Sequence, residues 1–258
     1  MSVAAWPAEA AVLEPGTLVI ADLHLDPAGE GRVTEFVAWL ARVRAARAPA
    51  LLVLGDLFDV WVGPVQAEHA GAAAVSSALA ELAETARVVV LHGNRDFLLG
   101  EAFERATGCR VFEEGYLGRL PGAKGPESRV VFVHGDQFCT RDRSYQRLKR
   151  VLRSAPVRAL APRVPYAVAG WAASRLRGAS QRAVPAKPKG ATAMQPEAVT
   201  GIARSAAAGT VVCGHGHVFR DEQLADGTRW IVLDSWGGER DLLRIDEGSL
   251  SALSHADA

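Results

Sequence analysis

Five short apolar runs, each followed at once by polar residues that commonly bind metals, are the feature that most restricts the fold. The runs cover residues 17–21, 51–54, 88–91, 130–133 and 210–213. Apolar runs of four or five residues that stop at turn signals predict strands buried on both faces. Residues 31–46, 68–85 and 101–107 are typical of helices, and 229–233 and 242–245 predict two further strands. This alternation predicts an α/β fold in which helices cover the faces of the sheets.

The polar residues after these runs share one chemistry. They are Asp22, His24, Asp56, Asn94, His134, His215 and His217. In open α/β sheets, ligands bind beyond the carboxyl ends of the strands, so these side chains can meet in one crevice. Imidazole, carboxylate and amide ligands suit Mn, Fe or Zn, and seven of them fit two ions about 3.5–4 Å apart. Any one of them alone could be a helix cap or a core histidine, but recurrence at five strands favours a two-metal site.

Charge is distributed unevenly although the net charge is zero. Residues 141–193 contain thirteen Lys or Arg and one acidic residue, so this segment carries +12 and the remainder −12. This asymmetry indicates an anionic partner, although a solvated arginine-rich helix is the alternative. Tyr145, Leu148 and Leu152 recur at helical spacing, and 156–177 adds further apolar residues. We expect helices whose apolar side lies against an anionic lipid surface or packs onto the main domain.

Composition excludes several other classes of protein. With 258 residues, 49% of them hydrophobic and 22% charged, the chain can bury a sizeable core and is not disordered throughout. No apolar run reaches the roughly 18–20 residues that span a bilayer, and the N-terminal segment lacks the pattern of a secretory signal. The three cysteines, Cys109, Cys139 and Cys213, are odd in number and far apart. We therefore expect reduced thiols and a cytoplasmic location.

The order of the motifs resembles the calcineurin-like metallophosphoesterase superfamily. These motifs are DLH at 22–24, GD at 55–56, GNRD at 93–96, HGD at 134–136 and GHGH at 214–217. Within the superfamily, GDLFDVWVG at 55–63, GNRDFL at 93–98 and HGDQFCTRDRSYQ at 134–146 are similar to the UDP-2,3-diacylglucosamine pyrophosphatases of lipid A biosynthesis. The resemblance covers nearly all of 18–245. It implies an α/β/β/α sandwich, as a single domain over 1–258 with a helical lid insertion at 141–194.

The resemblance also implies roles for particular residues. One ion would be bound by Asp22, His24 and His217, and the second by Asn94, His134 and His215, while Asp56 would bind both ions. These seven residues would also be the catalytic set, and Mn2+ would be the preferred metal. The reaction implied is hydrolysis of UDP-2,3-diacylglucosamine to UMP and 2,3-diacylglucosamine 1-phosphate. The residues implied in substrate binding are Asn94, Arg95, Asp142, Tyr145, Gln146, Ser180, Arg182, Lys189, Met194 and His215.

Arg95 bears on the type of reaction. Many relatives in the superfamily have a histidine here, which can protonate a leaving alkoxide, whereas arginine cannot because its pKa exceeds about 12. A phosphate monoester, with a second pKa of about 6, needs no such proton. We therefore expect Arg95 to bind a phosphate through a bidentate contact. The alternative is a surface arginine that pairs with Asp96.

Some positions depart from the family pattern while leaving all seven ligands in place. Pro64-Val65 replaces acidic residues, Gly216 replaces a threonine, Val218-Phe219 follows the last histidine, and the usual aspartate after Met194 is missing. These departures bear on acyl-chain length and lid geometry. The alternative functions are a soluble phosphodiesterase or phosphatase acting on nucleotides, and a non-catalytic scaffold. We expect a monomer that associates peripherally with the cytoplasmic face of the inner membrane and binds no nucleic acid, because the lid lacks an array of stacking aromatics.

Overall fold

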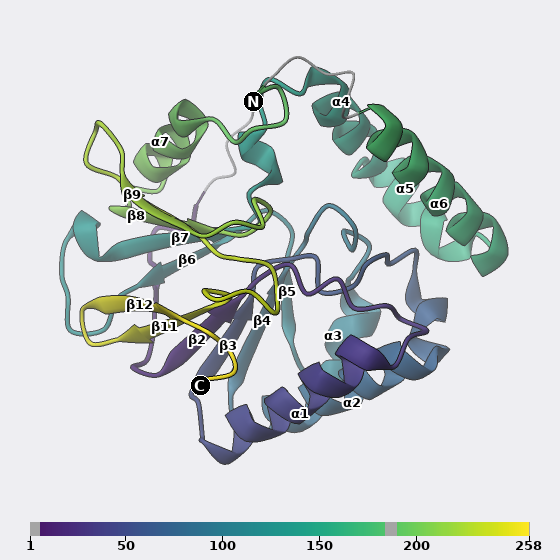
Figure 1. Ribbon diagram of the computed structural model, residues 1–258, viewed down its shortest axis with the longest axis horizontal. Coiled ribbons are helices and arrows are strands. Elements are labelled where there is room, and N and C mark those ends of the chain that lie inside the picture. The colour runs from purple at the N-terminus through teal and green to yellow at the C-terminus, as the bar shows by residue number, and fades with distance from the viewer. Residues whose placement is uncertain (1–5, 184–189, 258) are drawn as a thin grey trace.

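The computed structural model describes residues 6–183 and 190–257, and two six-stranded sheets form its centre (Figure 1). One sheet has the strand order β1 (Ala11–Val12), β6 (Tyr116–Arg119), β7 (Arg129–Val133), β8 (Thr210–Cys213), β10 (Arg229–Val232), β9 (Arg220–Gln223). The other has the order β12 (Ser249–Leu253), β11 (Leu242–Asp246), β2 (Thr17–Ile20), β3 (Ala50–Val53), β4 (Arg87–Leu91), β5 (Arg110–Phe112). Their inner faces pack together through a core that includes Val19, Leu52, Phe132 and Val212.

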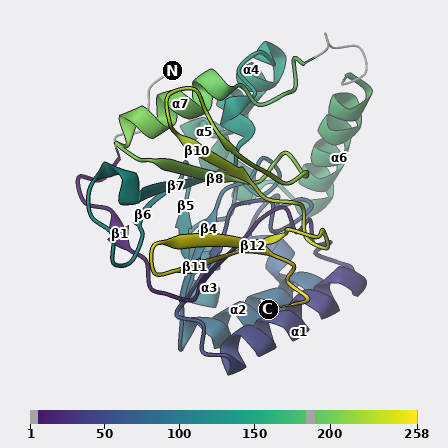
Figure 2. The ribbon, with the colours of Figure 1, turned by 60° about the vertical axis from the view of Figure 1, so that its left-hand side comes forward.

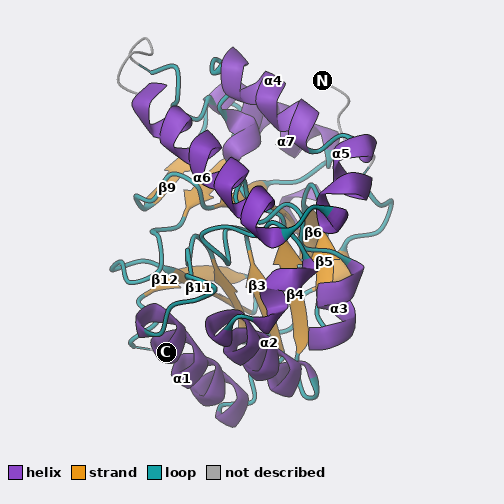
Figure 3. Cartoon of the chain, turned by 90° about the vertical axis from the view of Figure 1, so that its right-hand side faces the viewer, coloured by secondary structure: helices purple, strands orange, loops and turns teal. Residues whose placement is uncertain are grey.

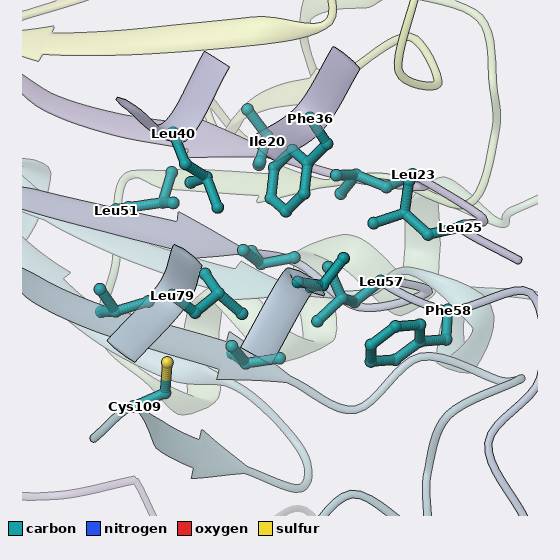
Figure 4. Close-up of a cluster of buried hydrophobic side chains, with 14 of the residues drawn as sticks. Ile20, Leu23, Leu25, Phe36, Leu40, Leu51, Leu57, Phe58, Leu79 and Cys109 are labelled. Carbon is teal, nitrogen blue, oxygen red and sulfur yellow. The ribbon is translucent and has the colours of Figure 1, made fainter. Parts of the chain in front are cut away.

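Helices cover the outer face of each sheet. Helices α1 (Gly31–Ala45), α2 (Ala70–Ala83) and α3 (Glu101–Thr107) lie on the β2–β3–β4 side, and α7 (Pro196–Ser205) lies on the β7–β8 side (Figure 2). Figure 4 shows Phe36 and Leu40 of α1 packed beside Ile20 and Leu51 of the strands. The predicted α/β/β/α sandwich is therefore confirmed.

Parallel pairing brings the predicted ligands to one edge of the molecule. Strand β3 pairs in parallel with both β2 and β4, and β8 pairs in parallel with both β7 and β10. The carboxyl ends of neighbouring parallel strands lie side by side. The loops after β2, β3 and β4 in one sheet therefore lie next to one another, as do those after β7 and β8 in the other.

Some elements differ from the sequence-based prediction. The predicted helix over 68–85 begins at Ala70, because Pro64–Glu68 forms a separate 3-10 turn and His69 is extended. Strands β1, β5, β6, β9 and β12 were not predicted. The all-exposed sequence RDEQ of β9 has no apolar pattern, and only its antiparallel pairing with β10 makes it a strand.

The basic insertion is helical, as expected. It contains α4 (Arg143–Leu152), α5 (Ala155–Leu160) and α6 (Tyr166–Ala183), with a 3-10 turn at Ala161–Arg163, and these helices project from the sandwich (Figures 1 and 3). Tyr166 at the start of α6 contacts the His69 ring at a centroid distance of 4.7 Å. Among the described residues, no helix is long and apolar enough to cross a membrane.

Candidate active site

Backbone strain is concentrated at the predicted ligands. Five of the seven have a left-handed backbone: φ is 53° at Asp22, 49° at His24, 51° at Asp56, 63° at His215 and 54° at His217. Among the other described non-glycine residues, only Arg47 and Ala207 share this conformation. It is unfavourable for residues with a Cβ and persists where the surrounding structure imposes it, most often at functional sites.

Both carboxylates are oriented by backbone groups. The Asp22 Oδ2 atom accepts a hydrogen bond from the His215 N–H at 2.6 Å, and Asp56 Oδ1 accepts one from the Arg95 N–H at 2.9 Å. Both side chains are buried, and they press against glycine backbone: a Cβ at Gly93 would lie 2.0 Å from Asp56 Oδ1. In each carboxylate the other oxygen is left to face the histidines. Such outer contacts fix the orientation of metal ligands.

One set of ligand atoms surrounds the first predicted metal position. The Nε2 atoms of His24 and His217 lie 3.2 Å apart, and His217 Nε2 lies 3.6 Å from Asp22 Oδ1. These three residues can place one ligand atom each within 4.8 Å of the others. Asp22 Oδ1 and His24 Nδ1 are buried and have no hydrogen-bond partner within the described part of the chain. Unpartnered buried polar atoms are costly, so this set of ligand atoms fits a cation.

A second set lies on the other side of the Asp56 carboxylate. The His134 Nδ1 atom must donate to the Leu54 carbonyl, 2.9 Å away, because a carbonyl only accepts. The Nε2 atom of His134 lies 3.0 Å from Asn94 Oδ1: it donates to this oxygen when the ring is protonated, and in the neutral ring its lone pair is available to a cation. Asp56 Oδ2 lies 3.7 Å from His24 Nδ1 and 3.8 Å from His134 Nε2, so it stands between the two sets.

The structure therefore brings all seven predicted ligands together. The His215 ring lies 5.0 Å from the His134 ring, which places it on the second side. One detail differs from the predicted division of the ligands: Asp22 Oδ1 is also 4.0 Å from His134 Nδ1, and Asp22, Asp56 and His134 form a second close group. Asp22 is thus near both positions rather than the first alone.

Burial sets the protonation of two of the four histidines in this cluster, His24 and His215, whereas nearby carboxylates raise the pKa of His134 and His217. Burial lowers the pKa of His24 to about 4, with a further contribution from Arg95, and it lowers the pKa of His215 to about 4. Both imidazoles are therefore neutral at pH 7, as metal ligands must be. Burial also raises the pKa of Asp56 to about 7. It acts in the same direction on Asp22, but the nearby His217 and His134 side chains outweigh it and lower the pKa of Asp22.

Arg95 lies at the edge of the cluster and pairs with Asp59, not with Asp96. Its guanidinium forms an ion pair with Asp59 Oδ1, and its Nε lies 3.5 Å from Asp56 Oδ2. Asp96 is buried and accepts backbone hydrogen bonds from Leu57 at 2.8 Å and Gly93 at 2.8 Å. The alternative interpretation of Arg95 as the partner of Asp96 is therefore wrong.

Three predicted substrate residues make the contacts that dock helix α4, and their role in substrate binding stays a prediction. Asp142 caps the helix by accepting from the Tyr145 N–H at 3.1 Å, and the Tyr145 hydroxyl donates to the buried Asp136. Gln146 donates to the Asp136 carbonyl at 2.9 Å. The Lys149 ammonium lies 2.7 Å from Asp136 Oδ2 with only 17% of its side chain exposed. The Asp136–Lys149 pair was not predicted from the sequence. The available signal was that Lys149 follows Tyr145 by one helical turn and so lies on the same face of the helix.

The remaining predicted substrate residues are spread along the lid. Met194 is buried in the core beneath α7, Arg182 is exposed on α6, and Lys189 and the side chain of Ser180 lie outside the described residues. A Cβ at Gly216 would lie 2.9 Å from Met194 Cε, so glycine here accommodates Met194. Beside the predicted metal ligands, a small pocket is lined by Asn94, Phe97, Tyr145, Leu148, Lys149, Leu152 and Arg153.

Comparisons with known proteins agree on one family. The family described as calcineurin-like phosphoesterase matches residues 17–219. A protein of Azotobacter vinelandii named UDP-2,3-diacylglucosamine hydrolase is 36% identical over 236 residues, which is 89% of this chain and 94% of the relative. Proteins of the same name from Pseudomonas aeruginosa and Pseudomonas syringae are 34% and 32% identical; these matches cover 89% and 91% of this chain, and 94% and 93% of the relatives.

Proposed function

Because the chain belongs to the calcineurin-like phosphoesterase family, in the group of the UDP-2,3-diacylglucosamine hydrolases, we propose that it hydrolyses the pyrophosphate bond of UDP-2,3-diacylglucosamine. The products are UMP and 2,3-diacylglucosamine 1-phosphate, the reaction of lipid A biosynthesis. One observation of the molecule carries the proposal: seven ligand-type side chains converge from five strand ends around two positions, and buried ligand atoms of Asp22 and His24 have no hydrogen-bond partner among the described residues.

The donor set fits two divalent cations, and we assign Mn2+ to both positions. His24, His217 and Asp22 would hold one ion, and Asn94, His134 and His215 the other, with Asp56 between them. When bound, two such ions lower the pKa of water and stabilise negative charge on a phosphoryl group. The Leu54 carbonyl accepts from Nδ1 of His134, so in the neutral ring Nε2 is free to bind a cation. Asn94 would add a ligand without adding negative charge.

The chain's own residues account for the choice of leaving group. Water adds to one phosphorus, the anhydride P–O bond breaks, and a phosphate monoester departs. Its second pKa is about 6, so it leaves without taking up a proton. Arginine keeps its proton at neutral pH and does not protonate a leaving group, so the Arg95 guanidinium can instead bind a phosphate oxygen beside Asp56.

The pocket next to Asn94 supports binding of the lipid part of the substrate. Its apolar wall consists of Phe97, Leu148 and Leu152, and its cations are Lys149 and Arg153. A lining that combines apolar and cationic side chains matches a molecule that combines acyl chains with phosphate groups. We include α4 to α6, within 141–194, as the lid of a single domain.

Exposed apolar residues of the lid support a peripheral membrane contact. Leu160 and Trp171 are each 62% exposed, Val168 is exposed one helical turn before Trp171, and Arg175 lies 5.1 Å from the centre of the Trp171 ring. Exposed tryptophan and leucine among arginines are typical of segments that lie in an anionic interface. We place the enzyme as a monomer on the cytoplasmic face of the inner membrane, where its lipid substrate is accessible, and we assign no nucleic-acid partner to the basic lid.

A substrate panel tests this function. The Mn2+-loaded protein is assayed with UDP-2,3-diacylglucosamine, UDP-N-acetylglucosamine, a cyclic nucleotide and single-stranded DNA. We expect rapid release of UMP from the lipid substrate and kcat/KM lower by orders of magnitude for the others, because remote binding energy supports the chemical step. Preference for the cyclic nucleotide would favour the soluble phosphodiesterase instead, and inactivity on all four would favour the scaffold.

A further inference from the structure

Arg95 is restrained by Asp59, a carboxylate that is not among the predicted site residues. The guanidinium of Arg95 pairs with Asp59 Oδ1 while its Nε lies 3.5 Å from Asp56 Oδ2. The side chains of Arg95 and Asp59 are each 31% exposed, so the pair lies at the mouth of the site and not in the core. The arginine is therefore held at two points, directly beside the carboxylate that stands between the two metal positions.

The backbones on both sides of this pair are anchored to the metal-site loops. The Asp59 N–H donates to the Leu25 carbonyl at 2.8 Å, next to His24, and the Trp61 N–H donates to the Arg95 carbonyl at 3.0 Å. The Arg95 N–H in turn donates to the Asp56 carboxylate. Because neither backbone needs the ion pair to hold it in place, the pair chiefly limits the rotamers of the guanidinium.

We propose that Asp59 is a positioning residue, which orients Arg95 so that its remaining N–H groups face the substrate phosphate. This inference rests on the proposed function, since it takes Arg95 as a phosphate ligand. A guanidinium has five N–H donors, so Asp59 and Asp56 leave others for a phosphate. Arginine has many rotamers, and fixing them before the substrate arrives lowers the entropy lost on binding. The Asp59 charge also reduces the repulsion between Arg95 and two divalent cations.

A double-variant cycle separates this role from a structural one. The variants are Asp59→Asn, Asp59→Glu, Arg95→Ala, and Asp59→Asn combined with Arg95→Ala. Asp221→Asn is the matched control, because Asp221 forms a two-bond ion pair with Arg229 at 2.9 and 2.7 Å, on the exposed edge strand β9. For each Mn2+-loaded protein, kcat and KM are measured with UDP-2,3-diacylglucosamine, and the dissociation constant of inorganic phosphate is measured by calorimetry. Metal content and melting temperature are recorded alongside.

We expect Asp59→Asn to weaken phosphate binding and to lower kcat/KM roughly 10-fold, the lower end of the effect of losing a charged hydrogen bond. Asp59→Glu should recover most of the loss, and Asp221→Asn should behave as the wild type. In the Arg95→Ala background, Asp59→Asn should change the dissociation constant of phosphate and kcat/KM by less than about 2-fold each, because Asp59 acts through Arg95. Equal losses in both backgrounds would overturn the inference. So would tighter phosphate binding by Asp59→Asn, which would make Asp59 a competitor of phosphate.

The phosphate measurement keeps this inference separate from the proposed function. If the wild type fails to hydrolyse UDP-2,3-diacylglucosamine, the proposed substrate is wrong. The dissociation constants of phosphate in the double-variant cycle still decide whether Asp59 acts through Arg95, because inorganic phosphate binds without the lipid or the nucleotide part of the substrate.

Discussion

Replacing Lys149 by methionine tests how helix α4 is attached to the loop that carries His134. Methionine keeps most of the volume of the side chain and removes its charge. Asp136 is only 1% exposed, so the variant leaves a buried carboxylate without the ammonium that lies 2.7 Å from it. Breaking a buried ion pair in this way costs about 3–5 kcal/mol. The Tyr145 hydroxyl still donates to Asp136, so we expect the free energy of unfolding to fall by about 3 kcal/mol, the lower end of that range.

The assay is urea unfolding with a chelator present, so that metal binding does not add to the stability of either protein. Arg147→Met, on the exposed side of the same helix, is the matched control and should change the free energy of unfolding by less than about 0.5 kcal/mol. The double variant Asp136→Asn with Lys149→Met removes both charges and should regain much of the stability. If Lys149→Met lowers the free energy of unfolding no more than Arg147→Met does, the Asp136–Lys149 pair does not hold α4 in place.

The sign of the pH dependence gives a second check on the same variant. Burial tends to raise the pKa of Asp136, but Lys149 and Arg153 outweigh burial and hold it far below the ordinary value. In the wild type this carboxylate therefore stabilises the fold above the unfolded pKa of about 4, and its contribution falls at lower pH. Without Lys149, burial raises the pKa, and protonation relieves the buried charge. The stability difference between variant and wild type should therefore shrink as the pH falls from 7 towards about 4.5.

Three further predictions concern the site and the lid. Asp56→Ala should remove activity and lower the content of bound Mn2+, measured by metal analysis; full occupancy with normal turnover would contradict its place between two ions. Arg95→His should slow pyrophosphate hydrolysis about 10- to 150-fold, because a charged hydrogen bond is lost, and should slow an alkyl phosphodiester less. Equal fractional losses on the two substrates would show that Arg95 does not discriminate by leaving group. Trp171→Asp should weaken binding to anionic lipid vesicles about 10-fold in a sedimentation assay, whereas Val12→Asp, at an exposed position of β1, should not. Identical binding by both variants would show that the lid does not contact the membrane.

The seven-residue cluster was predictable from sequence because each of its parts is local. A strand such as Thr17–Ile20 is recognisable from its apolar run, and the ligand follows within a few residues. Parallel pairing then brings the strand ends together by a general rule rather than by any particular contact. The helical character of the basic insertion was likewise encoded in the spacing of Tyr145, Leu148 and Leu152.

The partners of the charged side chains were decided only by the tertiary structure. Arg95 is adjacent to Asp96 in sequence, yet Asp96 is turned inward to backbone N–H groups and Arg95 pairs with Asp59, thirty-six positions away. The sequence predicts Tyr145 and Gln146 only as substrate residues, and their hydrogen bonds to Asp136 follow from the tertiary structure. A local pattern records which residues can ionise or donate. Which of them meet depends on how loops from different strands pack and on which groups burial forces to find a partner.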